Sequence, residues 1–274
     1  MKFTIITVTY NAEHTLERTL RSVAEQTYPH IEHILIDGAS KDRTLEIART
    51  HGKHLANIVS EPDKGLYDAM NKGLKLATGE YVCFLNAGDK LHAADTLEKI
   101  YHEVQAALNP SHPTGEERRN DAKAMDKAVL THAERLEELP GVLYGHTDIV
   151  DDNGHYLGPR HLTPPDRLNW KSFKQGMLVC HQAFYARRDL CVTYDTTFRF
   201  SADFDWCIRV MKQTDKLQHL PFTVCDYLQE GMTTRNHRAS LIERFHLMCR
   251  HYGTCLTLCH HLWFALRALC RVNN

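Results

Sequence analysis

Short apolar runs alternate with stretches of helical spacing four times in the first 107 residues, and this alternation restricts the fold more than any other feature. The apolar runs, rich in β-branched residues, are 3–8, 33–36, 57–60 and 81–85. Apolar side chains recur at helical spacing over 13–26, 43–49, 66–77 and 93–107. The alternation predicts an α/β fold of Rossmann-like type, in which a mainly parallel sheet is covered by helices on both faces.

Each of the four predicted strands runs directly into polar or acidic residues. These endings are Thr9-Tyr10-Asn11, Asp37-Gly38, Glu61-Pro62-Asp63 and Asn86-Ala87-Gly88-Asp89. Because ligands of open α/β sheets bind beyond the carboxyl ends of the strands, the four endings together predict one binding site along that edge. Asn and Asp also form ordinary turns, so for Asp37 or Asp63 taken alone a turn and a ligand contact stay equally open.

The regular alternation stops after about residue 100. Residues 109–140 contain prolines, a glycine and a charged stretch with helical spacing, which predicts a surface insertion of loop and solvated helix. A strand resumes at 142–144, and the sequence to about residue 235 is mixed and less regular. We therefore expect a first half at 1–100, a mixed second half at 101–235 and a helical tail at 236–274.

The composition is that of an ordinary folded protein and excludes some classes of function. The 33 basic and 34 acidic residues nearly cancel, whereas nucleic-acid binding needs a basic excess or stripe, so no nucleic-acid partner is predicted. The nine cysteines are scattered and no secretory signal precedes them, which predicts reduced thiols in a cytoplasmic protein. No run of about 18 apolar residues occurs, so no membrane-spanning helix is predicted.

The strand endings offer carboxylates and not a phosphate-binding glycine loop. Neither G-x-G-x-x-G nor G-x-x-x-x-G-K-[ST] occurs, which argues against a dehydrogenase-type cofactor fold and against a P-loop phosphotransferase. Carboxylates bind phosphates through a bridging divalent ion, for which Mg²⁺ or Mn²⁺ is suited. We therefore expect Asp89 to hold a metal against a diphosphate, with Gly88 leaving room for the diphosphate to approach.

Two segments resemble the nucleotide-sugar half of family-two glycosyltransferases with the A-type (GT-A) fold: FTIITVTYNAEHTLERTLRSVAEQTYPHIEHILIDGASKDRT and DKGLYDAMNKGLKLATGEYVCFLNAGD. The resemblance is close over about residues 1–100 and looser to about 235, and it rests on several motifs in a fixed order. It implies inverting transfer of a sugar from a nucleotide-diphosphate donor to an acceptor hydroxyl, with Mg²⁺ or Mn²⁺. By resemblance the nucleotide is UDP, although no residue excludes GDP.

The resemblance also assigns roles to individual residues. Those assigned to the donor are Thr9, Tyr10, Asn11, Glu13, Asp37, Lys64, Asn71, Asn86, Ala87 and Gly88. Asp89 is the implied metal ligand, and Asp203 in the segment SADFDW is the implied catalytic base, with Asp205 as the second candidate. The sequence departs from the family at two points, because Ala202 replaces a Glu that commonly precedes the base and only one acid remains of Asp-x-Asp-Asp. With one carboxylate, we expect metal affinity to be weak without the donor's phosphates.

Several polar residues have two open interpretations. His181, Gln182 and Asp205 are expected on the acceptor side, but for His181 a buried and hydrogen-bonded ring is the slightly favoured alternative. His237 either completes the metal shell from a flexible loop or belongs to an ordinary loop before a helix. Lys64 either contacts the phosphate or the base of the donor or is solvated.

The tail has the pattern of an amphipathic helix over 255–271. Leucines fall on one side and His260, Arg267 and Arg271 on another, with Trp263 and Phe264 between them. Such a helix lies in a membrane interface, docks on the protein or joins a second subunit in a homodimer. Cys255 and Cys259 do not have the usual zinc spacing, so we discount a zinc site.

The main functional hypothesis is an inverting, metal-dependent glycosyltransferase that builds a surface polysaccharide or glycolipid in the cytoplasm, with the inner membrane face as an option. Its partners are a nucleotide-sugar donor and a saccharide or lipid-linked acceptor. The alternative is a nucleotide-sugar-binding module whose catalysis has decayed, suggested by Asn86 and Ala202. A sugar-nucleotide pyrophosphorylase is disfavoured because the loop after the first strand reads Thr-Tyr-Asn-Ala-Glu and lacks a Gly-rich, basic sequence.

Overall fold

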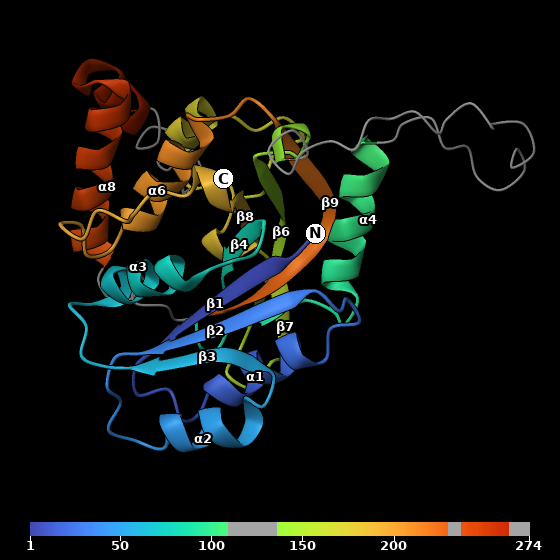
Figure 1. Cartoon of the computed structure of the whole chain (residues 1–274). Helices are drawn as coiled ribbons and strands as arrows, with labels where there is room; N and C mark the ends of the chain where they lie inside the picture. The colour runs from blue at the N-terminus through green and yellow to red at the C-terminus, as the bar shows by residue number, and fades with distance from the viewer. Residues whose placement is uncertain (109–135, 230–236, 263–274) are drawn as a thin grey trace, which may run out of the picture.

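The computed structural model describes residues 1–108, 136–229 and 237–262, with only the backbone for His237 (Figure 1). Most of the predicted insertion and part of the predicted tail therefore lie outside the described residues. In the described part of the chain, one sheet contains nine strands in the order β3-β2-β1-β4-β8-β6-β9-β5, with β7 beside β6. The sheet is continuous across the expected boundary at about residue 100, and the division into halves stays a prediction.

The first four strands form the parallel part of the sheet. They are β1 (Phe3–Thr9), β2 (Ile31–Asp37), β3 (Leu55–Ser60) and β4 (Tyr81–Phe84), and β1 pairs with β2 and β4 while β2 pairs with β3. The intervening helices are α1 (Leu16–Ala24), α2 (Thr44–His51) and α3 (Leu66–Leu76), and α4 (Thr96–Leu108) follows β5 (Lys90–Leu91). Because all four strands run the same way, their polar endings share one edge, as predicted.

Helices cover both faces of this part of the sheet. Figure 1 shows α1 and α2 on one side and α3 on the other. The alternation of side chains along β2 explains this arrangement, because Leu35 packs with Leu16, Leu20 and Ala48 from α1 and α2. Ile36, which points the other way, belongs with the main core. The predicted α/β fold class is confirmed.

The second half adds strands of both directions. β8 (Phe184–Arg187) lies antiparallel between β4 and β6 (Val142–Val150), and β9 (Leu217–Leu228) lies parallel to β6. β5 and β7 (Tyr156–Pro159) are both antiparallel to their neighbours. Three short 3-10 helices, η1 (Trp170–Gln175), η2 (His181–Ala183) and η3 (Arg188–Leu190), precede α6 (Ala202–Met211). The predicted mixed character of this region is confirmed.

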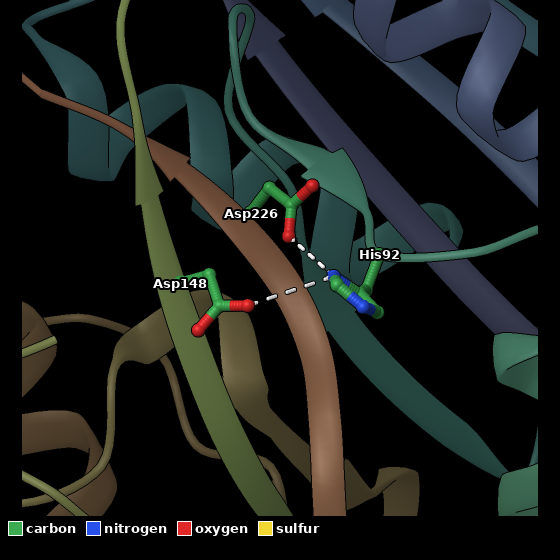
Figure 2. Close-up of side chains that lie close together, drawn as sticks. All are labelled: His92, Asp148 and Asp226. Carbon is green, nitrogen blue, oxygen red and sulfur yellow. Dashed lines mark hydrogen bonds and ion pairs between the residues drawn. The ribbon is translucent and has the colours of Figure 1, made fainter. Parts of the chain in front are cut away.

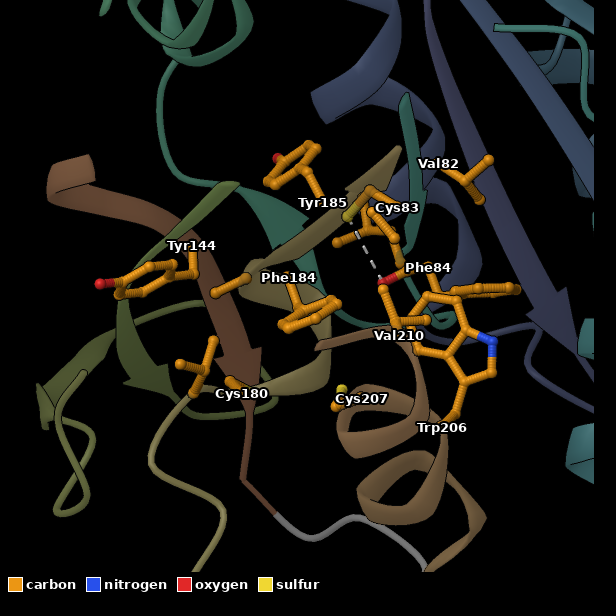
Figure 3. Packing of buried hydrophobic residues seen from close by; sticks show 14 of the residues in the cluster. Val82, Cys83, Phe84, Tyr144, Cys180, Phe184, Tyr185, Trp206, Cys207 and Val210 are labelled. Atoms are coloured by element: carbon orange, nitrogen blue, oxygen red, sulfur yellow. Dashed lines mark hydrogen bonds between the residues drawn. The ribbon is translucent and has the colours of Figure 1, made fainter. Parts of the chain in front are cut away.

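The main core joins the two halves around Trp206 of α6. The Trp206 ring meets Phe84 of β4 and Phe184 of β8 edge to face, with ring centroids 5.6 and 5.8 Å apart (Figure 3). Its indole nitrogen donates to the carbonyl of Val192 at 2.7 Å, so the buried polar atom is satisfied. A fully buried Trp of this kind fixes α6, and with it the first-turn acids of α6, against the sheet.

Element boundaries differ from the predicted ones where the chain makes contacts across loops. α1 begins at Leu16 and not at residue 13, because Glu13 accepts a hydrogen bond from the backbone N–H of Arg43. The strand predicted at 142–144 extends to Val150, since β9 pairs along its whole length. α8 (His237–Tyr252) ends before Gly253, whose φ is 86°, and residues 254–262 are helical again. Among the described residues, no helix is long and apolar enough to cross a membrane.

Candidate active site

The loops after β1 and β2 are tied together at the edge of the sheet. Asn11 has a φ of 48°, and its side-chain oxygen accepts a hydrogen bond from the backbone N–H of Lys41 at 2.8 Å. In return the N–H of Asn11 donates to the Ser40 hydroxyl at 2.8 Å. The backbone N–H of Glu13 donates to Asp42 at 3.1 Å. These reciprocal bonds give the predicted first donor loop a fixed shape.

Asp37, which the resemblance assigns to the donor, is fully buried at the end of β2. One carboxylate oxygen accepts from the Ser40 N–H at 3.0 Å and from the Ser60 hydroxyl at 2.7 Å, and the other accepts from the Ser40 hydroxyl. Asp37 thus links the ends of β2 and β3 from within. In this structure it shapes the edge and does not present a free carboxylate.

Tyr10, Gly38 and Asp63 form the exposed part of the edge. The Tyr10 ring is 62% exposed. A Cβ on Gly38 would lie 2.4 Å from a carboxylate oxygen of Asp63 and 3.3 Å from the Tyr10 ring, so only glycine lets both side chains approach. Next to this edge the hydroxyl oxygen of Thr9 and the side-chain oxygen of Asn86 are buried without a hydrogen-bond partner. Lys64 is exposed, and its backbone N–H bonds to Asp68 at the start of α3. The exposed aromatic face of Tyr10 is suited to a ring-containing ligand.

Asp89 is buried, with an exposed fraction of only 3%. One carboxylate oxygen accepts from the backbone N–H of Leu228 at 3.0 Å, and the other accepts from the side-chain amide of Gln182 at 2.8 Å. Burial raises the pKa of Asp89 to about 7, despite the lowering effect of these bonds. Asp89 therefore joins the first half of the sheet to β9 and η2.

The loop before Asp89 is held by α1. Gly88 has a φ of 109°, its N–H donates to the Thr19 hydroxyl at 2.8 Å, and its carbonyl accepts from Arg18 at 2.6 Å. A Cβ on Gly88 would lie 2.7 Å from the Leu228 side chain. The sequence led us to expect room for a diphosphate beside Gly88, but in this structure the Leu228 side chain packs there. Ala87 is half-buried in the same loop, and its N–H donates to Val8.

Asp203 lies at the second position of α6 and is half-buried. One of its carboxylate oxygens accepts from the Tyr67 hydroxyl at 3.2 Å and from the N–H of Phe204 at 2.8 Å. Tyr67 comes from α3 and stacks on Tyr194, with ring centroids 5.5 Å apart. The structure therefore brings the predicted base to the α3 side of the sheet edge and leaves part of it accessible.

His181 and Asn71 both hold Tyr194. The Nε2 atom of His181 lies 2.7 Å from the Tyr194 hydroxyl, and its ring stacks on Phe84. Burial lowers the pKa of His181 to about 4, so the ring is neutral at pH 7. The side chain of Asn71 exchanges two hydrogen bonds with the backbone of Tyr194, at 3.1 and 2.7 Å. In this structure both residues position an aromatic side chain, and His181 is buried while Asn71 is half-buried.

Asp205 has a different environment from Asp203, although it lies only two residues later. It is fully buried, and it bonds to His251 at 2.8 Å and to Arg209 at 2.6 Å. Burial alone would raise the pKa of Asp205, but the His251 hydrogen bond and Arg209 lower it overall. Asp205 therefore connects α6 to α8, which leaves Asp203 as the accessible acid of the pair. The side chain of His237 lies outside the described residues.

One group of described residues has the composition of a divalent-metal site: His92, Asp148 and Asp226 (Figure 2). The Nδ1 atom of His92 lies 2.6 Å from Asp226 and 3.9 Å from Asp148. The Lys90 ammonium lies 2.8 Å from the other oxygen of Asp226, so a cation already pairs with this acid. Side chains alternate along β9, so Asp226 and Tyr227 point to opposite faces of the sheet.

Sequence reasoning missed Tyr67, Tyr194, Arg18 and Thr19. Tyr67 and Thr19 lie on the apolar faces of α3 and α1, where their spacing indicates core and not a site. Their polar atoms find partners from distant parts of the chain, which the local pattern does not reveal. The polar atom of an otherwise core-facing Tyr or Thr was the only available signal.

The first half of the chain matches a protein-family model. The model described as Glycosyl transferase family 2 matches residues 4–109. A PGL/p-HBAD biosynthesis glycosyltransferase of Mycobacterium bovis is 34% identical over 213 residues, which cover 76% of this chain and 68% of that protein.

Two solved structures have a similar fold. TarS (residues 1–349) of S. aureus in complex with UDP-GlcNAc has a TM-score of 0.62 at 20% identity, with 90% of this chain and 64% of that chain covered. The mannosyltransferase PcManGT of Pyrobaculum calidifontis in complex with GDP-Man and Mn²⁺ has a TM-score of 0.56 at 18% identity, with 99% and 79% covered. The order of the strands, the polar strand endings and the relative that aligns along most of both chains all indicate the same family. The chain belongs to glycosyltransferase family 2 and has the GT-A fold.

Proposed function

We propose that this glycosyltransferase moves a sugar from a nucleotide-diphosphate donor, a UDP-sugar, to an acceptor hydroxyl with inversion at the anomeric carbon. The observation that carries the proposal is Asp203, a partly accessible acid at the start of α6, held by the Tyr67 hydroxyl beside the carboxyl ends of the strands. UDP-GlcNAc in the TarS complex supports the choice of nucleotide. The relative named for PGL/p-HBAD biosynthesis supports an acceptor that belongs to a glycolipid or polysaccharide.

The reaction needs one base and one direct displacement. Asp203 accepts the proton of the acceptor hydroxyl while the oxygen attacks the anomeric carbon, and the bond to the diphosphate breaks on the opposite side. A single displacement inverts the configuration. Tyr67 donates to one carboxylate oxygen of Asp203, which leaves the other oxygen for the incoming proton. Tyr10, exposed at the edge of the sheet, is the side chain suited to stack against the base of the nucleotide.

A divalent ion, Mg²⁺ or Mn²⁺, belongs to the proposal, supported by the Mn²⁺ named with the archaeal mannosyltransferase. The fit to this chain is limited, because both oxygens of Asp89 already accept hydrogen bonds from Leu228 and Gln182. As it lies, Asp89 does not form a resident metal site. An ion that enters with the donor would be held mainly by phosphates and water, with at most one protein carboxylate, and would stabilise charge on the leaving diphosphate.

The proposal is tested by calorimetric titration of UDP, GDP and UDP-sugars, each with and without Mn²⁺, on the wild type and on Asp89→Ala. We expect one diphosphate to bind, more tightly with Mn²⁺. Loss of the Mn²⁺ effect in the variant would assign the ion to Asp89. No binding of any nucleotide diphosphate would overturn the proposal.

The same samples distinguish an enzyme from the decayed binding module. Donor hydrolysis or transfer over a wide panel of acceptors indicates an active enzyme, whereas nucleotide binding without either supports the module. The described cysteines are all free thiols, which suits a reducing compartment and supports the cytoplasm as the place of action.

A further inference from the structure

A stacked aromatic pair lies where η1, α6 and α8 meet. The rings of Trp170 and Tyr252 are nearly parallel at 5°, with centroids 5.7 Å apart, and the Tyr252 hydroxyl donates to the Trp170 carbonyl at 2.7 Å. Both residues are half-buried, so each ring keeps an exposed part. Neither residue has a role in the proposed reaction.

Three lysines surround this pair. Lys212 lies 4.6 Å and Lys171 5.6 Å from the centre of the Trp170 ring, and Lys174 lies 5.5 Å from the centre of the Tyr252 ring. The Lys212 ammonium also hydrogen-bonds to Nδ1 of His251 at 3.0 Å. Among the described residues, no ion pair joins any of the three ammonium groups to a carboxylate. In a chain whose 33 basic and 34 acidic residues nearly cancel, three lysines without a carboxylate partner make this part of the surface locally positive.

Exposed leucines follow the aromatic pair directly along the chain. The chain turns at Gly253, with a φ of 86°, and the helical residues 254–262 present Leu256, Leu258 and Leu262 with exposed fractions of 39%, 53% and 64%. This helix lies beside α8, because the rings of Phe245 and His261 meet at 5.1 Å. The aromatic pair, the three lysines and these leucines together are called the basic aromatic patch.

We infer that the basic aromatic patch binds the surface of an anionic lipid bilayer. Trp and Tyr are enriched at the level of lipid headgroups, lysines without a carboxylate partner are attracted by anionic lipids, and exposed leucines insert at the boundary with the acyl chains. A neutral protein partner would not account for the three ammonium groups. The purpose of this binding rests on the proposed function, because a membrane-bound enzyme reaches a lipid-linked acceptor. The binding itself is measured independently of that function.

The test is flotation of the full chain with vesicles of phosphatidylcholine alone and of phosphatidylcholine mixed with phosphatidylglycerol. We expect binding to the mixed vesicles that weakens as salt is added. The triple variant Lys171→Gln, Lys174→Gln, Lys212→Gln should lose about a hundredfold in partition to the mixed vesicles. The matched control, Lys53→Gln, Lys75→Gln, Lys99→Gln, removes the same charge from exposed sites elsewhere and should keep the binding.

Several results would overturn the inference. These are no binding to mixed vesicles, equal losses in the two triple variants, or a wild-type dimer in gel filtration that the patch variant alone dissociates. Leu258→Ser with Leu262→Ser provides a second check, because lost insertion should weaken vesicle binding while thermal unfolding stays unchanged. A chain that binds UDP and transfers sugar to a soluble acceptor, yet ignores vesicles, would overturn this inference and leave the proposed function intact.

Discussion

Asp203 and Asp205 lie two residues apart on α6, and their partners give them different tasks. Asp203 keeps contact with solvent and receives one side-chain hydrogen bond, whereas Asp205 is enclosed between His251 and Arg209. A base must exchange a proton with a substrate, which requires access more than proximity to other charges. The sequence motif alone could not separate the two acids, because the difference arises from α8.

Asp203→Asn should remove the base and leave the fold unchanged. We expect the transfer rate to fall by about 10² to 10⁴, since general-base help is worth that much, while the donor affinity measured by calorimetry stays the same. Asp215→Asn, at an exposed acid beyond the end of α6, serves as the control and should keep the wild-type rate. Wild-type turnover in Asp203→Asn would place the base elsewhere.

Asp89 should make stability depend on pH in an unusual direction. Its folded-state pKa of about 7 lies above the ordinary value of 3.8, so between these values the native chain holds a proton that the unfolded chain has released. The unfolding free energy of the wild type, relative to Asp89→Asn, should therefore fall as pH rises from about 4 to about 7, by at most about 4 kcal/mol. Urea unfolding of both proteins across this range provides the measurement. A difference that stays flat or increases would show that Asp89 is ionised in the native state.

At the scale of elements, the contact between α6 and α8 depends on one buried acid. Asp205→Ala leaves the buried Nε2 atom of His251 without a partner and removes the ion pair to Arg209, so we expect the unfolding free energy to fall by about 3 kcal/mol. The comparison is Glu25→Ala, which breaks the exposed pair with Arg21 and should cost about 0 to 1 kcal/mol. Equal costs in urea unfolding would mean that burial of the Asp205 pair has no special weight.

The packing of α3 on the sheet depends on a glycine inside the helix. A Cβ on Gly73 would lie 2.4 Å from a methyl carbon of Ile6 and 3.3 Å from Ile36. Gly73→Ala gains about 1 kcal/mol of helix propensity, but overpacking costs about 1 to 3 kcal/mol, so we expect a net loss of stability. Thermal unfolding measures the change in stability, with Lys75→Ala on the exposed side of α3 as the control. A stabilised Gly73→Ala would show that α3 shifts outward without cost.

At the scale of the whole molecule, local patterns predicted the elements better than the contacts between them. The strand and helix alternation of the first 107 residues is a local property, and β1 to β4 with α1 to α4 appear close to the predicted ranges. The parallel direction of the four strands also predicted which edge of the sheet has the candidate site. The SADFDW motif, which singled out Asp203, forms the start of α6.

The contacts that shape the site were not predictable because they join distant residues. Gln182 and Asp89 are 93 positions apart, and Tyr67 and Asp203 are 136 apart. Whether a carboxylate is exposed to solvent or hydrogen-bonded to an amide depends on how the second half packs against the first. The local spacing of residues does not predict that packing. Asp89 was therefore expected as an open metal ligand, and the structure shows both of its oxygens engaged.

The position of β9 between β6 and β5 has a consequence for synthesis on the ribosome. The backbone N–H of Leu228, the last residue of β9, donates a hydrogen bond to Asp89, so the 86–89 loop is complete only after every described strand of the sheet has been translated. Until then β5 and β6 lack their shared neighbour and expose unpaired edges, which invite aggregation. We expect ribosome-bound chains arrested before β9 to be cut readily by protease near Asp89, and chains long enough to release β9 from the exit tunnel to resist. Early resistance would mean that the first half folds without its closing strand.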